Sequence, residues 1–180
     1  MKKIIAFGAS NNSMSINKQF AAYAANQISN VEVTLLDLND FELPVYSVDI
    51  EKESGVPTNA SKFSQLIADS DGVIISLAEY NGLHTAAFKN LWDWMSRLGS
   101  PKIWHNKPLF LLGTSPSKRE ESNVMKVSQY LFPMFSAEII ASYHLPSFNH
   151  FFKDGQIAEP NQQALFASEL EKFQNHLYNH

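Results

Sequence analysis

Short apolar runs alternate along the chain with longer segments in which apolar residues recur at helical spacing. The runs predicted as buried strands are residues 4–7, 31–36, 73–77, 108–112 and 138–143. The segments predicted as helices are residues 15–29, 59–69, 85–97, 122–132 and 162–178. Pro133 is expected to stop the fourth of these helices. Residues 37–58 are polar and carry Pro44 and Pro57, which predicts a long loop.

A regular alternation of strands and helices predicts right-handed crossovers and a parallel sheet with helices on both faces. Five strands suit the flavodoxin-like order 2-1-3-4-5, in which the first, third and fourth strands are neighbours. No composition shift or linker-like stretch divides the 180 residues. We therefore expect an α/β protein in which residues 1–180 form a single flavodoxin-like domain.

Three turns rich in small or polar residues follow the first, third and fourth predicted strands. They are residues 8–17, 78–83 and 113–117. Ligands of open parallel sheets bind beyond the carboxyl ends of the strands, at the point where the strand order reverses. The three turns are therefore predicted to meet in one binding crevice.

The first turn leads directly into a predicted helix. The unpaired N–H groups of a helix N-terminus favour a phosphate group as ligand. The side-chain donors that the turn adds are Ser10, Asn12, Ser13, Ser15 and Asn17. The dinucleotide pattern G-x-G-x-x-G and the lysine-containing P-loop are both absent from the sequence. A structural alternative is that Ser13 or Ser15 only caps the helix.

The second turn and the helix after it carry the most specific pattern. Glu79-Tyr80-Asn81-Gly82 and residues 87–97 (AFKNLWDWMSR) resemble the P-E-Y-N-G and L-K-N-x-[IL]-D-W-x-S-R stretch of the NADPH-dependent FMN reductase family. The first turn is similar to that family's G-S-x-R-x-x-S-x-N phosphate loop. Residues 114–116 are similar to its T-S-P-G-G loop. The resemblance spans roughly residues 4–140, in the chain order that a flavodoxin-like sheet requires.

The resemblance implies that each subunit binds one FMN and uses NAD(P)H as co-substrate. The phosphate ligands implied by position are Ser10, Asn12, Ser15, Ile16 and Asn17. The residues implied to flank the flavin are Glu79, Tyr80, Asn81 and Gly82, with Thr114 and Ser115 from the third loop. A hydride would pass from NAD(P)H through flavin N5 to a small electron acceptor such as a quinone, an azo compound or free flavin. No catalytic side chain is then required.

His84 is the one side chain considered for a proton-donating role near the flavin. The alternative is a loop histidine that is simply solvated. Lys118 and Arg119 are considered for attracting the phosphates of a dinucleotide, with solvated charges at a loop tip as the alternative.

The chain departs from the family pattern at several positions. Asn12 replaces the arginine of the phosphate loop, so the phosphate would rely on neutral donors and the helix end. Ala78 replaces a proline, and Ser117-Lys118 replace Gly-Gly in the third loop. Two alternatives to a reductase therefore stay open: a flavodoxin-type electron carrier, and a flavin-binding regulatory module without turnover.

The amino-acid composition limits which classes of molecule are expected as partners. Fourteen Lys and Arg against 18 Asp and Glu give a formal net charge of −4. This mild imbalance disfavours the electron carrier, which would need a strongly acidic docking surface. No basic cluster is present, so neither nucleic acid nor a membrane is an expected partner.

Residue types exclude further chemistry. The absence of cysteine excludes disulfides, thiolate nucleophiles and cysteine-ligated metals, and the histidines show no metal-ligand spacing. The first apolar run is too short for a signal peptide or a membrane span, which predicts a cytoplasmic protein.

The predicted helix at 85–97 carries two bulky faces. Its core stripe consists of Phe88, Leu91, Trp92 and Met95. Trp94 lies on another face and predicts a subunit interface, in a homodimer or a homotetramer. Asp93 and Arg97 stand at i,i+4 and are predicted to form a surface ion pair.

Overall fold

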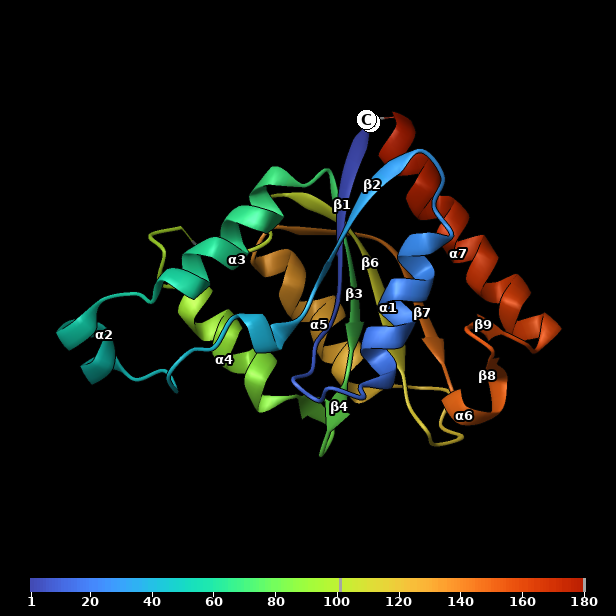
Figure 1. Cartoon of the computed structure of the whole chain (residues 1–180), viewed down its shortest axis with the longest axis horizontal. Coiled ribbons are helices and arrows are strands. Elements are labelled where there is room, and N and C mark those ends of the chain that lie inside the picture. The colour runs from blue at the N-terminus through green and yellow to red at the C-terminus, as the bar shows by residue number, and fades with distance from the viewer. Residues whose placement is uncertain (101, 180) are drawn as a thin grey trace.

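The computed structural model describes residues 1–100 and 102–179, and a five-stranded parallel sheet forms its centre (Figure 1). The strand order is β2-β1-β3-β6-β7, which confirms the predicted order 2-1-3-4-5. The strands are β1 (Lys2–Gly8), β2 (Val31–Leu36), β3 (Gly72–Leu77), β6 (Lys107–Thr114) and β7 (Ala137–Leu145). Each predicted strand is present, most of them one or two residues longer at one or both ends than the apolar run alone indicated.

Helices cover both faces of the sheet. The helices α1 (Ile16–Asn26) and α7 (Pro160–Asn179) pack on one face, to the right in Figure 1. The helices α3 (Thr58–Asp69), α4 (Ala86–Met95) and α5 (Asn123–Met134) pack on the other face. The strand sequences require this double cover, because side chains of a strand alternate between the faces of its sheet. In β1, Ile4 belongs to the core under α1 and α7, and Ile5 to the core under the other helices.

The polar segment predicted as a long loop contains two short helical elements. A 3-10 helix, η1 (Leu38–Asp40), directly follows β2, and α2 (Val48–Ser54) projects from the body of the molecule (Figure 1). The prediction of an unbroken loop was therefore wrong. Ser47 caps α2 by accepting a hydrogen bond from the backbone N–H of Ile50. This cap is a local signal for the helix, because α2 itself has no buried residue.

Two small hairpins and a single-turn helix escaped prediction because each is too short to show a period. The strands β4 (Glu79–Tyr80) and β5 (Leu83–His84) form a hairpin over the second turn. After β7 come the single-turn helix α6 (Phe148–Phe151) and the hairpin of β8 (Phe152–Lys153) and β9 (Gln156–Ile157). These elements lie at the carboxyl end of the sheet in Figure 1.

Helices α5 and α1 end at other residues than expected. Pro133 lies inside α5, which continues to Met134, so the prediction that Pro133 stops the helix was wrong. A proline one residue before the end removes a single backbone hydrogen bond, which explains why the helix tolerates it. Helix α1 ends at Asn26, three residues before the predicted end.

Trp94 is fully buried within its own chain, so it does not provide the exposed second face from which a subunit interface was predicted. Its ring packs edge-on against Tyr46 with centroids 5.0 Å apart, and its Nε1 donates to the Pro44 carbonyl oxygen at 2.7 Å. The segment after η1 therefore covers the second bulky face of α4. A homodimer or homotetramer stays a prediction without this support.

The predicted pair of Asp93 and Arg97 does not form. Asp93 pairs with Lys89 at 2.7 Å, and Arg97 pairs with Glu51 of α2 at 2.9 Å. Helix α4 ends at Met95, so Arg97 no longer has the helical geometry that would place it one turn from Asp93.

Candidate cofactor site

The three predicted turns meet beyond the carboxyl ends of β1, β3 and β6, around a cavity of about 270 Å³. Its predicted lining residues are Ser10, Asn12, Ser15, Ile16, Asn17, Glu79, Tyr80, Thr114 and Ser115. Asn81 and Gly82, which were predicted with them, do not line it. The residues that prediction missed are Met14, Ala78, Pro116 and Asn149. Asn149 belongs to α6, and nothing in the local sequence connects that turn with the crevice.

The first loop is ordered by its own side chains. Ser10 Oγ accepts from the Asn12 backbone N–H at 3.1 Å, and Asn12 Oδ1 accepts from the Met14 backbone N–H at 2.9 Å. Ser15 caps α1, because its Oγ accepts from the backbone N–H of Lys18 at 3.3 Å. The N–H groups of Ile16 and Asn17 lie in the first helical turn and have no acceptor within the helix. This end of the cavity suits an anion.

No cation contributes to that anion site among the described lining residues, which include no lysine or arginine. Lys18, next in the helix, forms an ion pair with Asp37. Burial alone would raise the pKa of Asp37, but Lys18 and the backbone N–H of Asn39 lower it below its usual value. Neutral hydroxyls, N–H groups and the α1 dipole are thus the available donors.

Gly8 ends β1 at a point where a side chain cannot fit. A Cβ atom there would lie 2.4 Å from the backbone nitrogen of Lys18. The absence of a side chain at Gly8 lets the first turn of α1 pack directly on the end of β1.

Asn17 is almost fully buried, and both polar atoms of its amide are hydrogen bonded to protein groups. Its partners are the side chain of Ser76 and the backbone of Thr114. Its Oδ1 accepts two hydrogen bonds and one N–H of its Nδ2 donates to Thr114, so most of the amide's hydrogen-bonding capacity is used within the protein at the border of the cavity.

The carboxylate of Glu79 is held at the N-terminus of α5. Its Oε2 accepts from the Ser122 hydroxyl at 2.8 Å and from the Val124 backbone N–H at 3.1 Å, and its Oε1 pairs with Arg119. Burial acts to raise the pKa of Glu79, but these three donors outweigh it and lower the pKa. Glu79 is therefore an ionised cap at the N-terminus of α5.

The hairpin of β4 and β5 turns at Asn81 and Gly82, whose φ angles are 52° and 85°. An Asn-Gly pair favours this left-handed turn, because glycine has no Cβ penalty and asparagine tolerates positive φ. Tyr80 is half exposed, and Leu83 is 55% exposed on the partner strand. The hairpin thus presents an exposed apolar edge beside the cavity.

His84 is the second residue of β5; it is partly buried and does not line the cavity. Its Nε2 shares a hydrogen bond of 2.7 Å with Ser128 Oγ, and its ring packs against Phe88, Trp92 and Phe132. Burial, with a smaller effect of Lys89, lowers the pKa of His84 to about 4. The histidine is neutral near pH 7, and a proton-donating role near the flavin stays a prediction.

The third loop is anchored to α6. Thr114 Oγ1 donates to the Leu145 carbonyl oxygen at 2.7 Å, and the Ser115 and Ser117 carbonyl oxygens accept from the backbone N–H groups of Phe148 and Ser147. Behind this loop lies a second cavity of about 550 Å³ that Lys118, Arg119 and His144 border. Arg119 is paired with Glu79, so it is not simply a solvated loop charge.

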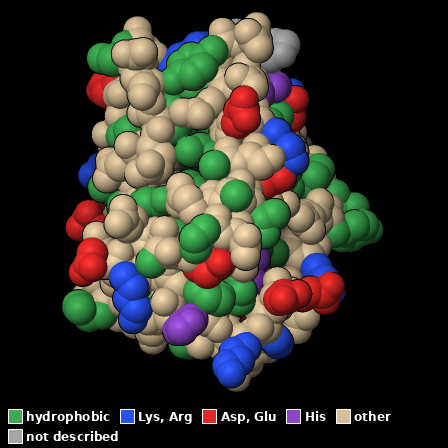
Figure 2. Space-filling model, turned by 90° about the vertical axis from the view of Figure 1, so that its right-hand side faces the viewer, with side chains coloured by type: hydrophobic (Ala, Val, Ile, Leu, Met, Phe, Trp, Pro, Cys, Tyr) green, Lys and Arg blue, Asp and Glu red, His purple; other side chains and the backbone are tan. Residues whose placement is uncertain are grey.

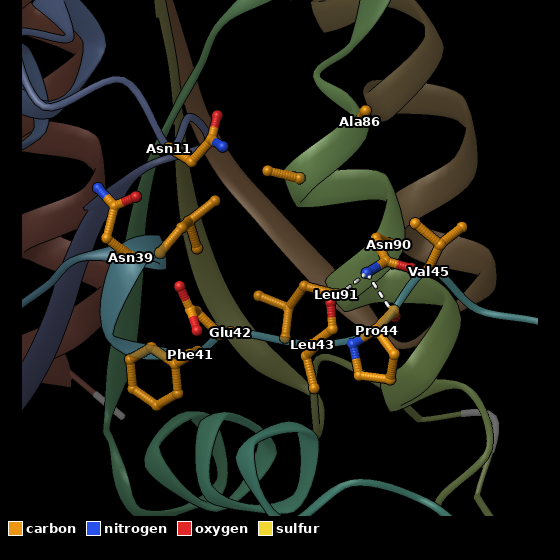
Figure 3. Close-up of a pocket in the computed structure, with 12 residues that line it drawn as sticks. Asn11, Asn39, Phe41, Glu42, Leu43, Pro44, Val45, Ala86, Asn90 and Leu91 are labelled. Carbon is orange, nitrogen blue, oxygen red and sulfur yellow. Dashed lines mark hydrogen bonds between the residues drawn. The ribbon is translucent and has the colours of Figure 1, made fainter. Parts of the chain in front are cut away.

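A larger cavity of about 710 Å³ lies between α4 and residues 38–45 (Figure 3). Asn90 bridges its two sides, since its Nδ2 donates to the Pro44 carbonyl oxygen at 3.0 Å and to that of Leu43 at 3.4 Å (Figure 3). Asn11, at the tip of the first loop, also borders it. The cavity lies where residues 38–45 pack against α4 and cover Trp94. The sequence pattern did not predict this contact.

Charged side chains of both signs are interspersed on the face shown in Figure 2, without a basic cluster. Within residues 1–100 and 102–179, no three histidine, aspartate or glutamate side chains meet in a way that could hold a metal ion. His180, included in the expectation of no metal site, lies outside the described residues. None of the described helices has the length and apolar character needed to cross a lipid bilayer.

The family model of the NADPH-dependent FMN reductases matches residues 2–150. The chain belongs to this family. The resemblance inferred from the three turns is thereby confirmed.

Relatives and solved structures agree with this assignment. The chain is 39% identical over 102 residues to a 2-hydroxy-1,4-benzoquinone reductase of a Burkholderia species, which covers 56% of this chain and 54% of that protein. It is 37% identical over 74 residues to the quinone reductase of Escherichia coli K12, covering 41% and 39%. These matches span about half or less of the relatives' length.

Solved structures align with the entire chain. The flavoenzyme NAD(P)H:(acceptor) oxidoreductase FerB of Paracoccus denitrificans superposes with a TM-score of 0.75, covering 100% of this chain and 99% of that one. The sequence identity is 19%, so this likeness bears on the fold.

Proposed function

We propose that this protein binds FMN at the meeting point of the three loops and uses it to reduce a small acceptor, such as a quinone, with NAD(P)H. The observation that carries the proposal is the cavity that joins the N-terminus of α1 to the second and third loops. Membership of the NADPH-dependent FMN reductase family supports the cofactor and the co-substrate. The names of the curated relatives support a quinone as acceptor.

The donor set of the cavity fits FMN. The first turn of α1 and the hydroxyls of Ser10 and Ser15 suit a monophosphate, since helix N-termini stabilise anions without a cation. Tyr80 and the Ser115–Pro116 stretch would flank a planar ring from two sides. When bound, FMN supplies the redox chemistry: hydride uptake from NAD(P)H at N5 and transfer to the acceptor.

The role left to the protein's own residues is to bind the cofactor, orient it and shield it from water. Ser15 and the N–H groups of Ile16 and Asn17 would fix the phosphate end, and Asn12 would contribute its amide at the mouth of the first loop. Thr114 and Ser115 would fix the distance of the third loop from the ring. The redox step itself would belong to the cofactor.

A flavin-binding module without turnover is the second candidate. The observation that favours it is the absence of a described cation at the phosphate end, together with the Arg119 to Glu79 bridge across the second and third loops. A carrier of the flavodoxin type has less support, because the charge of −4 is mild. A cytoplasmic location and self-association remain predictions.

The decisive experiment combines a flavin titration with turnover. We expect the purified protein to bind FMN more tightly than FAD, because the phosphate loop closes one end of the cavity. We then expect FMN-dependent oxidation of NADH or NADPH that a benzoquinone accelerates. Absence of flavin binding would refute the proposal, and FMN binding without NAD(P)H oxidation would identify the regulatory module.

A further inference from the structure

The Asn17 side chain joins three separate parts of the fold. It belongs to the first turn of α1, and its Oδ1 accepts from Ser76 Oγ at 2.8 Å and from the Thr114 backbone N–H at 3.1 Å. Its Nδ2 donates to the Thr114 carbonyl oxygen at 3.2 Å. Ser76 lies in β3, and Thr114 is the last residue of β6.

These hydrogen bonds require one orientation of the Asn17 amide, with Oδ1 accepting and Nδ2 donating. Asn17 is 4% exposed, Ser76 is fully buried and Thr114 is 3% exposed. The amide contacts both the N–H and the C=O of Thr114, the residue at which the sheet ends and the third loop begins. A buried amide that lost these partners would leave several polar groups unsatisfied, so the arrangement resists rotation toward a ligand.

We propose that Asn17 is a positioning residue that fixes the third loop relative to α1, and that its side chain is not a ligand of the phosphate. This inference rests on the proposed function for its consequences on flavin binding. It departs from the role that the sequence resemblance assigns to Asn17. Because Asn17 belongs to α1 and bonds to Thr114, its side chain links the phosphate end of the cavity to the ring end.

The phosphate itself provides the test, because riboflavin is FMN without it. If Asn17 positions the third loop, Asn17→Ala weakens the binding of FMN and riboflavin by the same factor, on the order of tenfold for the lost hydrogen bonds. The bound flavin should also show an altered visible absorption spectrum at saturation, since the loop beside the ring has moved. A change in stability alone would leave that spectrum unchanged.

Ser76→Ala is the second variant, because Ser76 touches Asn17 and does not line the cavity. We expect a smaller loss, again equal for both flavins. We expect its effect to vanish in the Asn17→Ala background, since the two variants break the same contact. Thermal unfolding of each protein verifies that it is folded.

Amide hydrogen exchange of the flavin-free protein separates this inference from the proposed function. Asn17→Ala should accelerate exchange at residues 114–117 relative to Ser15→Ala, which lies in the same loop but does not contact Thr114. Unchanged exchange there would overturn the inference whether or not flavin binds. A loss of FMN affinity with riboflavin affinity intact would also overturn it and make Asn17 a phosphate ligand. A wild-type protein that binds neither flavin would refute the proposed function and leave the exchange result to decide on Asn17.

Discussion

The Glu79 carboxylate and the Arg119 guanidinium form an ion pair that joins the second loop of the candidate site to the third. The Glu79 side chain is 12% exposed and that of Arg119 58%. Glu79 is also held by Ser122 and Val124 at the start of α5, so its position does not depend on Arg119 alone. Arg119 is the more exposed partner, and it directly follows Ser117-Lys118, which replace the family's Gly-Gly.

Removing this charge should loosen the third loop. We expect Arg119→Gln to raise the dissociation constant of FMN about two- to fivefold, the effect of one exposed ion pair. Titration at low and high salt provides the measurement. The difference from wild type should shrink at 1 M salt, where such pairs are screened.

Lys118→Gln is the matched control, because it removes the same charge from the neighbouring position and Glu79 does not contact it. The FMN affinity of Lys118→Gln should stay within twofold of wild type, because a single exposed charge contributes little free energy. Equal losses in both variants would point to a general effect of positive charge and would refute a specific bridge.

Ser15→Ala tests the placement of the phosphate. The Ser15 hydroxyl caps α1 and has its own O–H left to donate, so its removal should weaken FMN binding by about 0.5–1.5 kcal/mol. Riboflavin binding should change much less, because riboflavin has no phosphate. Isothermal titration with both flavins measures the difference. Equal losses would mean that Ser15 serves only as a cap.

Asn12→Arg should strengthen FMN binding. Asn12 is exposed at the mouth of the cavity, where no described cation is present. A guanidinium that reaches the phosphate adds a charge-assisted contact of roughly 1.5–3 kcal/mol. The control is riboflavin, whose affinity should not rise. An unchanged affinity for FMN would place the phosphate out of reach of this loop position.

His84 makes the stability of the protein depend on pH. Its folded-state pKa is about 4, below the value of 6.5 for a free histidine. Between these values the unfolded chain takes up a proton and the folded chain does not. Stability should therefore fall as the pH drops from 6.5 toward 4, by up to about 1 kcal/mol for each pH unit. Denaturant unfolding at several pH values measures this slope.

His84→Gln supplies the control for that slope, because glutamine is neutral and can bond to Ser128. Burial also lowers the pKa of His105 and His144, so the wild-type slope contains all three contributions. The difference between wild type and His84→Gln isolates His84. Parallel curves for the two proteins would show that His84 already carries a proton in the folded state.

Strand order and the meeting of the three turns could be predicted from the sequence. Each depends on signals between close neighbours in the chain: the apolar run of a strand, the small residues that follow it and the helix that begins next. The Asn81-Gly82 turn is of the same kind, because a positive φ is a property of the residues themselves. The cavity at the carboxyl ends of β1, β3 and β6 follows once these local signals are combined.

The direction of individual side chains was decided by the tertiary structure. Asn17 bonds to Ser76 and Thr114, which lie 59 and 97 residues away in the chain, and Glu79 bonds to residues 40 or more positions later. Trp94 is covered by Pro44, 50 residues before it. A polar side chain turns toward whichever donor or acceptor the packed chain brings within about 3 Å. The sequence determined which residues meet at the edge of the sheet, whereas only the packed structure determined which of them face a ligand and which hold the loops together.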